Sequence, residues 1–165
     1  MVLTFELIHK KDITDSHRKI FADLLEKQGK VGGDYQIKAD RCKTICIVTC
    51  DNIPVAIGAI KEKTKSDFSS AKANLVNLEN LFEWELGYLY TSQSMTGKGI
   101  ANQITKLLIS DFGNDNLMAS TELSANPSMV NILLRNGFKN YGNPFRSQLH
   151  NNILGLFLKF GIKTA

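Results

Sequence analysis

The sequence predicts one α+β domain, and three observations lead to this expectation. Its 165 residues suit a single domain over residues 1–165, because ordinary domains contain about 100–150 residues. Apolar residues make up 43 % of the chain and charged residues 22 %, close to the averages of globular proteins. Segments with strand and helix periodicity follow one another in the order β-α-(α)-β-β-β-α-β-α-β-β. We therefore expect a sheet of about seven strands with helices packed against it.

The first half of the chain is expected to form a strand, a helix and a β-hairpin. Residues 2–8 alternate as a strand does. Asp12 or Thr14 can cap the next helix, whose apolar residues recur at helical spacing. Asp51-Asn52 is a good turn pair between two β-branched segments. These segments are Thr44–Cys50 and Pro54–Ile60.

The second half alternates strands and helices and ends in two strands. The expected elements are a strand at 82–91, a helix at 100–109, a strand at 117–123, a helix from Pro127, and strands at 138–141 and 153–160. Pro127 suits the first turn of a helix that Asn126 caps. A loop rich in Gly, Pro and Asn, which carries Arg146 and His150, joins the last two strands. Residues 28–42 and 61–80 match no clear pattern.

Composition excludes several classes of partner. The net charge is +4, but the basic residues are spread along the chain, so no nucleic-acid patch is expected. No segment approaches the ~20 apolar residues of a membrane span, and the first residues lack the pattern of a signal peptide, so neither is expected. We expect a cytoplasmic protein. Cys42, Cys46 and Cys50 lie in a β-branched segment without a nearby histidine, so no metal site is expected.

Gly97-Lys98-Gly99 lies between a predicted strand and a predicted helix. Such a turn lets backbone N–H groups surround an anion at the positive end of the helix dipole. A Walker loop would need glycine at Ser92, and a Rossmann fingerprint would need glycine at Asn102. The loop therefore predicts an anion site of another type.

The run from Leu89 to Ala101 resembles the cofactor signature of the GNAT superfamily of acyl-CoA-dependent N-acyltransferases. Asn126 and the Gly137-Phe138 pair resemble its second signature, and the two signatures cover residues 82–140. The resemblance implies a three-layer α/β-type arrangement: a mixed, mostly antiparallel sheet with helices on both faces and a splayed fourth strand. It also implies direct transfer of an acetyl group from acetyl-CoA to a primary amine, without a metal.

The resemblance assigns the cofactor contacts to the end of the fourth strand, the loop and the following helices. They are Leu89, Tyr90, Thr91, Met95, Thr96, Gly97, Lys98, Gly99, Ile100, Ala101 and Asn126. The sequence departs from the family at three positions. Ser94 and Thr96 stand where the loop commonly has cationic or amide side chains. Their presence weakens the positive charge near the pyrophosphate but leaves the backbone amides of the loop in place. Leu133 replaces the tyrosine that many members use as general acid, so that role is vacant or falls to another group.

Candidate catalytic residues lie on the fourth predicted strand. Glu83 and Glu85 are two residues apart and share a face, and Glu83 stands where several family members hold a catalytic glutamate. Burial beside Trp84 and Tyr88 would raise a carboxyl pKa toward that of a general base; the alternative is a solvated face or a surface ion pair. Glu122 is a further candidate base.

Tyr88 and Tyr90 can donate a proton to the departing thiolate, with core packing as the alternative. Arg146 can bind a carboxylate of the acceptor, and the alternative is an exposed loop arginine. His9 and His17 are expected to be structural.

The leading hypothesis is an acetyltransferase that acts on a small-molecule amine. Protein or aminoacyl-tRNA amines stay open as acceptors, and the resemblance allows a homodimer through the final strands. Two alternatives remain: a GNAT-like module that binds acyl-CoA without turnover, as a sensor or interaction domain, and a different phosphate-binding α/β domain.

Overall fold

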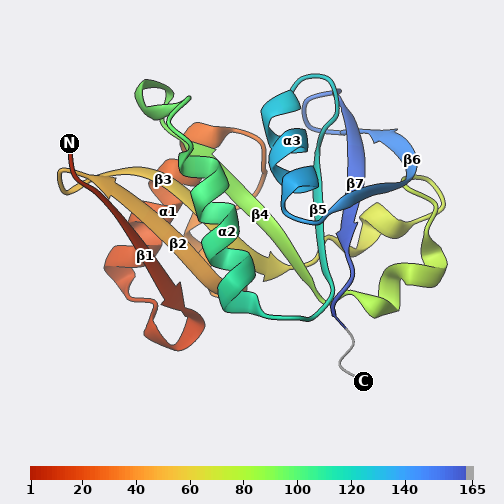
Figure 1. Ribbon diagram of the computed structural model, residues 1–165, viewed down its shortest axis with the longest axis horizontal. Helices are drawn as coiled ribbons and strands as arrows, with labels where there is room; N and C mark the ends of the chain where they lie inside the picture. Colours follow the sequence, from red (N-terminus) through yellow and green to blue (C-terminus); the bar gives the residue numbers. More distant parts are fainter. Residues whose placement is uncertain (163–165) are drawn as a thin grey trace. The chain divides into compact units, whose positions relative to one another are not determined.

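The computed structural model describes residues 1–162, which form a seven-stranded sheet with three α-helices (Figure 1). The strands are β1 (Leu3–His9), β2 (Cys42–Cys50), β3 (Ile53–Glu62), β4 (Trp84–Thr91), β5 (Leu117–Glu122), β6 (Lys139–Arg146) and β7 (Ile153–Lys159). The helices are α1 (Asp15–Gln28), α2 (Ile100–Phe112) and α3 (Pro127–Arg135). Short 3₁₀ helices lie between these elements at Lys10–Asp12, Tyr35–Arg41, Lys65–Phe68, Val76–Leu81 and Gln93–Met95.

The sheet is mixed and mostly antiparallel, as expected. Its strand order is β1-β2-β3-β4-β5-β7-β6. The pairs β1/β2, β2/β3, β5/β7 and β6/β7 are antiparallel, whereas β4/β5 is parallel. The β4/β5 register joins Trp84 to Leu117 and Glu85 to Met118, at the beginning of both strands. The predicted splay of β4 after Leu89 stays a prediction.

The chain divides into two compact units, which we describe separately. The first unit contains residues 1–61 and 87–111, and the second contains residues 62–86 and the chain from Phe112 onward. The expectation of a single domain over residues 1–165 stays a prediction.

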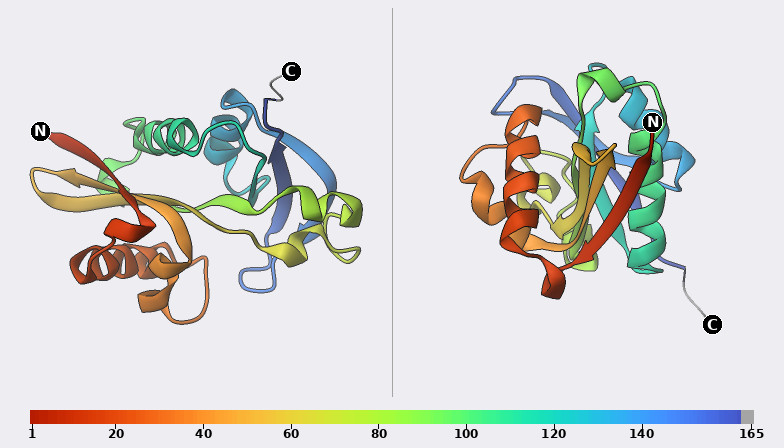
Figure 2. Two further views of the ribbon diagram at one scale, coloured as in Figure 1. Left: turned by 90° about the horizontal axis from the view of Figure 1, so that it is seen from below. Right: turned by 90° about the vertical axis from the view of Figure 1, so that its left-hand side faces the viewer.

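In the first unit, α1 and α2 cover opposite faces of the β1–β3 sheet (Figure 2). Ile45, Ile47, Ile57 and Ala59 belong to the same buried cluster as the apolar face of α1. Gly58 points to the other face, where a Cβ atom on it would lie 2.5 Å from Cγ2 of Ile104 in α2. Alternation along the strands thus gives each helix its own apolar face.

In the first unit, the helix caps and the hairpin turn are formed by residue types that favour them. Thr14 caps α1: its Oγ1 accepts from the His17 N–H, and the His17 side chain accepts from the Thr14 N–H. Gly29 ends the helix at φ 71°. Asp51 and Asn52 have φ values of 49° and 70°, as a tight hairpin turn requires.

The second unit packs β5, β7 and β6 against the segment that leads into β4. Its core gathers large apolar side chains from these elements: Phe68, Phe82, Met118, Phe145, Leu156 and Leu158. Asn126 caps α3, and Pro127 occupies its first turn, as predicted. β6 is longer than predicted and ends at Arg146, so the placement of Arg146 in a loop is wrong. Within residues 1–162, no helix has the length and apolar character needed to cross a membrane.

Candidate functional site

The C-terminal half of β4 departs from regular strand geometry. Tyr88 has φ 57°, a left-handed conformation that non-glycine residues rarely adopt and that is often found near functional sites. The Gln28 side-chain amide donates to the Leu89 carbonyl over 2.7 Å. At the end of the strand, the backbone N–H and the hydroxyl of Ser92 both donate to the Val55 carbonyl, over 2.8 Å and 2.7 Å. The strand end is therefore fixed before the loop begins.

The loop after β4 begins with a short 3₁₀ turn and continues through two left-handed glycines. Met95 is buried and anchors the turn, and the Thr96 hydroxyl donates to the Gln93 carbonyl over 2.9 Å. Gly97 and Gly99 both have φ 78°, and a Cβ atom on either would meet no atom within 4 Å. Glycine adopts this left-handed backbone without strain. Because glycine also has no side chain, the backbone of the loop stays open and exposed.

α2 begins directly behind these glycines and points its N-terminus at the open surface. Ile100, Ile104 and Leu108 are buried along one face and hold the helix on the sheet. Its first turn contains no acidic residue, and the Lys98 side chain is exposed beside it. The first N–H groups of a helix lack intrahelical partners and carry the positive end of the dipole. The arrangement fits a pyrophosphate group, with the amides from Met95 to Ala101 as donors.

The candidate carboxylates have different surroundings. Glu83 is exposed and precedes β4, which begins at Trp84 rather than at 82. The prediction that Glu83 and Glu85 share a face of this strand is therefore wrong. Glu85 is buried, and its Oε1 accepts from the Thr64 N–H over 2.8 Å. Of the two carboxylates, Glu85 is therefore the buried one and Glu83 the exposed one.

Tyr88 is buried in the first unit. Its ring lies edge-on to Phe21, with 5.8 Å between centroids, and the Lys61 Nζ lies 5.2 Å from its centroid. Tyr90 lies at the border of the same apolar cluster. Core packing therefore accounts for the rings of both tyrosines.

The structure brings together a polar cluster that the sequence did not predict. Glu122, at the end of β5, is buried; its Oε2 accepts from Asn152 Nδ2 over 2.7 Å, and its Oε1 lies 3.9 Å from His150 Nε2. The register between β5 and β7, which pairs Glu122 with Leu154, creates this cluster. Sequence spacing gives no signal for it, because thirty residues separate Glu122 from Asn152.

The side chains of two further candidates have structural partners. Asn126 Oδ1 accepts from the Met129 N–H over 3.2 Å, which is its capping contact. Arg146 is exposed, and its Nη1 donates to the Asn151 carbonyl over 3.0 Å. Leu133, at the position of the family's tyrosine, is fully buried. Leu133 has no proton to donate, so the general-acid role of the family's tyrosine is vacant or falls to another group.

Two of the three cysteines are buried in the core. Burial, with a contribution from Glu6, raises the pKa of the Cys46 thiol to about 12, so it stays a protonated core thiol. Cys42 is also buried. Among residues 1–162, no cluster of His, Cys, Asp and Glu side chains is suited to hold a metal ion.

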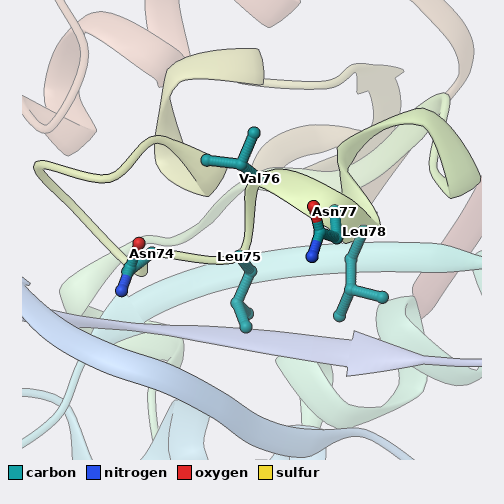
Figure 3. Close-up of a pocket in the computed structure, with 5 residues that line it drawn as sticks. All are labelled: Asn74, Leu75, Val76, Asn77 and Leu78. Atoms are coloured by element: carbon teal, nitrogen blue, oxygen red, sulfur yellow. The ribbon is translucent and has the colours of Figure 1, made fainter.

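A surface pocket of about 530 Å³ lies in the second unit, and consecutive residues line it: Asn74, Leu75, Val76, Asn77 and Leu78 (Figure 3). This lining contains amide and aliphatic side chains and no titratable group. The pocket therefore offers no acid–base chemistry.

Comparison with known proteins gives matches among solved structures alone. No family model and no curated protein matches the chain. The NatC complex bound to Gag peptide and CoA includes a chain with a TM-score of 0.71 and 14 % identity, over 99 % of this chain and all (100 %) of that one. The chain has the GNAT fold. At such low identity the similarity establishes the fold rather than the substrate.

Two further structures with the GNAT-like arrangement extend the comparison. An acyl-CoA N-acyltransferase from Pseudomonas aeruginosa has a TM-score of 0.67 and 10 % identity, over 96 % of this chain and 99 % of that one. YncA from Salmonella typhimurium, with its cofactor acetyl-CoA, has a TM-score of 0.64 and 13 % identity, over 100 % of this chain and 97 % of that one. The match thus extends over the whole fold rather than over the loop alone.

Proposed function

We propose that this chain is an N-acetyltransferase that moves the acetyl group of acetyl-CoA directly to the primary amine of a small molecule. The observation that carries the proposal is the open backbone loop of Gly97 and Gly99 at the N-terminus of α2. A loop of this kind binds a pyrophosphate group through backbone amides. Structures of the same fold with CoA and with acetyl-CoA support this assignment.

Each part of the loop has a distinct role in holding the cofactor. The amides from Met95 to Ala101 bind the pyrophosphate, and Lys98 adds a positive charge at the rim. The backbone of Leu89, Tyr90 and Thr91 binds the pantetheine arm beyond the left-handed residue Tyr88. Asn126 meets the pantetheine through its amide nitrogen, which takes no part in the capping contact of Oδ1.

The chain supplies the groups for the proton transfers. When bound, acetyl-CoA supplies a thioester whose C–S bond breaks as the amine nitrogen forms a new C–N bond. Glu85 accepts the proton that the amine loses, with Glu83 and Glu122 as the other candidate bases. The Tyr88 hydroxyl donates the proton that the departing thiolate requires, since Leu133 cannot.

The cofactor site is tested by calorimetric titration with acetyl-CoA. We expect micromolar binding by the wild type and its loss in Gly97→Glu, because the new carboxylate occupies the anion site and strains a left-handed position. Gly113→Glu is the matched control, since Gly113 also has a positive φ, 95°, and open space around its Cβ position. It lies beyond the opposite end of α2, so its binding should stay within about twofold of the wild type.

Two results would contradict the assignment. Folded wild-type protein that fails to bind acetyl-CoA would exclude an acetyltransferase. Equal losses of binding in both glycine variants would show that strain, rather than the loop's anion site, governs the effect.

A second candidate function is binding of acyl-CoA without turnover. The buried Leu133 in place of the tyrosine, together with Ser94 and Thr96 in the loop, favours it. Release of CoA thiol in the presence of amines separates the two functions: a binding module releases none above the rate without amine.

A further inference from the structure

Gln28, the last residue of α1, makes a hydrogen bond that reaches from the helix to β4. Its Nε2 donates to the Leu89 carbonyl over 2.7 Å. A carbonyl oxygen can only accept, so the atom of Gln28 that faces it must be the amide nitrogen. The other atom of the amide, Oε1, is buried and has no hydrogen-bond partner among residues 1–162. The contact with Leu89 therefore sets the orientation of the Gln28 side chain and leaves its oxygen unpaired.

The unpaired oxygen makes this contact a poor source of stability. A hydrogen bond contributes only modestly to the free energy of folding, because both groups bind water in the unfolded chain. Burying an acceptor without a partner costs at least as much. The gain at Nε2 and the cost at Oε1 thus offset each other. Because buried polar groups are nearly always paired, this exception indicates a role in function, where proteins retain arrangements that do not stabilise the fold.

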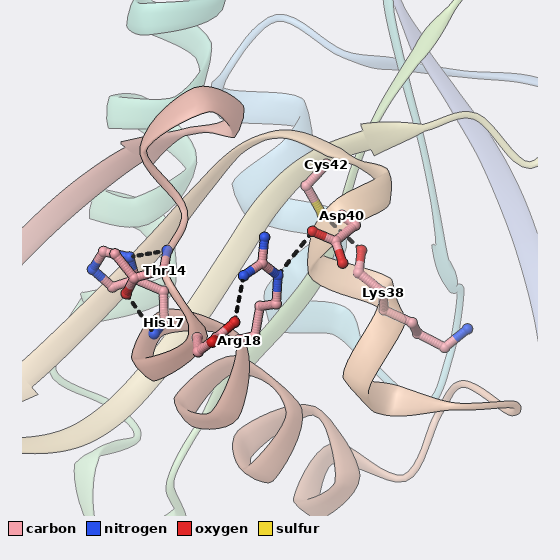
Figure 4. Close-up of polar contacts among 7 residues, drawn as sticks. Thr14, His17, Arg18, Lys38, Asp40 and Cys42 are labelled. Atoms are coloured by element: carbon pink, nitrogen blue, oxygen red, sulfur yellow. Dashed lines mark hydrogen bonds and ion pairs between the residues drawn. The ribbon is translucent and has the colours of Figure 1, made fainter.

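α1 gives Gln28 a fixed support. The helix packs on the sheet through four buried residues: Phe21, Ala22, Leu24 and Leu25. At its beginning, Arg18 donates to Asp40 over 2.9 Å and to Asp15 over 2.8 Å (Figure 4). The contact with Asp40 joins the first turn of α1 to the 3₁₀ helix at Tyr35–Arg41. Gln28 therefore reaches β4 from a helix that is held in place along its length.

The hydrogen bond acts on the peptide group that follows the strained residue of β4. Tyr88 has φ 57°, a conformation that costs free energy and persists only where the surrounding structure enforces it. The peptide group between Leu89 and Tyr90 is trans and planar, so a fixed carbonyl also fixes the direction of the Tyr90 N–H. Gln28 therefore holds the backbone directly after the left-handed turn.

The same contact places the Gln28 amide at the edge of β4 that faces away from β3. The Ser92 N–H donates to the Val55 carbonyl of β3 over 2.8 Å, and N–H groups two residues apart point to the same edge of a strand. The Tyr90 N–H therefore points toward β3, and the Leu89 carbonyl points toward the opposite edge.

We propose that Gln28 is a positioning residue of the thioester site. By holding the Leu89 carbonyl, it keeps the backbone of Leu89, Tyr90 and Thr91 in the geometry that binds the pantetheine arm and presents the thioester to the amine. The Leu89 carbonyl oxygen has two lone pairs, so it can accept from a pantetheine N–H as well as from Gln28. This inference rests on the proposed acetyltransferase function and adds a residue to that same site.

Gln28→Met separates positioning from stability, because methionine has a similar length but no comparable donor or acceptor. We expect the Tm to stay within about 3 °C of the wild type, since removal of the unpaired oxygen offsets the lost hydrogen bond. In assays of CoA thiol release, kcat should fall about tenfold, while the Kd of acetyl-CoA changes less than about threefold because the loop provides most of the binding. Without ligand, amide hydrogen exchange at residues 88–90 should become at least about tenfold faster.

Two further variants tie the effect to the hydrogen bond. Gln28→Lys keeps a donor that can reach the Leu89 carbonyl, and its kcat should stay within about threefold of the wild type. Gln36→Met is the matched control, because Gln36 is an exposed glutamine outside α1. It should behave as the wild type in every measurement.

Several outcomes would overturn the inference. A larger fall in the Tm of Gln28→Met would make Gln28 a support of the fold, and an unchanged kcat would make its contact dispensable. Tighter binding of acetyl-CoA by Gln28→Met would mean that Gln28 obstructs the site. A kcat of Gln28→Lys as low as that of Gln28→Met would exclude the hydrogen bond as the cause.

The exchange measurement does not depend on turnover. Unchanged hydrogen exchange at residues 88–90 in Gln28→Met would overturn the inference even if the wild type binds acetyl-CoA without releasing thiol. Failure of acetyl-CoA to bind the wild type is a different result, which refutes the proposed function itself.

Discussion

Asn126 combines a structural contact with a proposed cofactor contact, and the two use different atoms. Its Oδ1 caps α3 by accepting from the Met129 N–H, whereas the proposed pantetheine contact uses the amide nitrogen. Serine caps helices about as well as asparagine but has no amide. We expect Asn126→Ser to keep the Tm within about 2 °C of the wild type and to weaken acetyl-CoA binding roughly two- to tenfold.

Asn126→Ala provides the comparison, since it removes the cap as well as the amide. It should cost about 1 kcal/mol of unfolding free energy and weaken acetyl-CoA binding as much as the serine variant does. Thermal unfolding and calorimetry on the three proteins check this. Unchanged acetyl-CoA affinity in Asn126→Ser would assign Asn126 to capping alone.

Residues whose role is local could be predicted from the sequence, and residues whose role depends on distant partners could not. Thr14 and Asn126 act within three residues of their own position, so the spacing predicted Asn126 as a cap and Thr14 as one of two alternatives with Asp12. The Gln28 contact with Leu89 spans 61 residues, and the left-handed conformation of Tyr88 has no signature in its residue type. Tertiary packing fixes both, and no local pattern encodes it.

The contact between α2 and β3 positions the proposed cofactor loop, because α2 carries the loop at its N-terminus. A Cβ atom on Gly58 would lie 2.5 Å from Ile104 Cγ2 and 2.9 Å from Leu89 Cδ2. Gly58→Ala would therefore overpack this interface and destabilise the protein by about 1–3 kcal/mol. Displacement of α2 should also weaken acetyl-CoA binding. Urea denaturation and calorimetry measure the two effects.

A double-mutant cycle tests whether the clash with Ile104 is the cause. Ile104→Ala alone should cost about 2–5 kcal/mol because Ile104 is fully buried. In the Gly58→Ala/Ile104→Ala protein the removed side chain makes room for the new methyl group. The combined loss should then be smaller than the sum of the single losses by at least about 0.5 kcal/mol. If the losses of unfolding free energy in the two single variants simply add, the clash of the new methyl group is not with Ile104.

At the level of elements, the sequence predicted the α-helices and most strands because each carries its own periodicity and stop signals. Residues 61–80 were not predicted, because the 3₁₀ turns in this segment depend on long-range contacts. Lys63 Nζ, for example, donates to the Glu79 and Phe82 carbonyls over 2.8 Å and 2.6 Å. β6 extends to Arg146 because Phe145 and Arg146 pair with Leu154 and Ile153 of β7, despite Gly142 and Pro144 in the strand.

For the whole molecule, the family resemblance predicted a mixed, mostly antiparallel sheet, but the order of the strands in that sheet was not predicted. Periodicity identifies strands, but it does not say that β7 inserts between β5 and β6. The same holds for the site: the loop of Gly97 and Gly99 was visible in the sequence, whereas the cluster of Glu122, His150 and Asn152 depends on that insertion. Local signals therefore predicted the glycine loop but not this polar cluster.

If the loop binds acetyl-CoA in the native state alone, the ligand must stabilise the fold by mass action. At a ligand concentration of 100 times Kd the gain is about 2.7 kcal/mol. For a chain of 165 residues this corresponds to a rise in Tm of roughly 5–10 °C. Thermal unfolding should show this rise for the wild type and for Gly113→Glu, and none for Gly97→Glu. A rise of equal size in Gly97→Glu would mean that acetyl-CoA binds elsewhere on the protein, since the new carboxylate lies within the proposed pyrophosphate site.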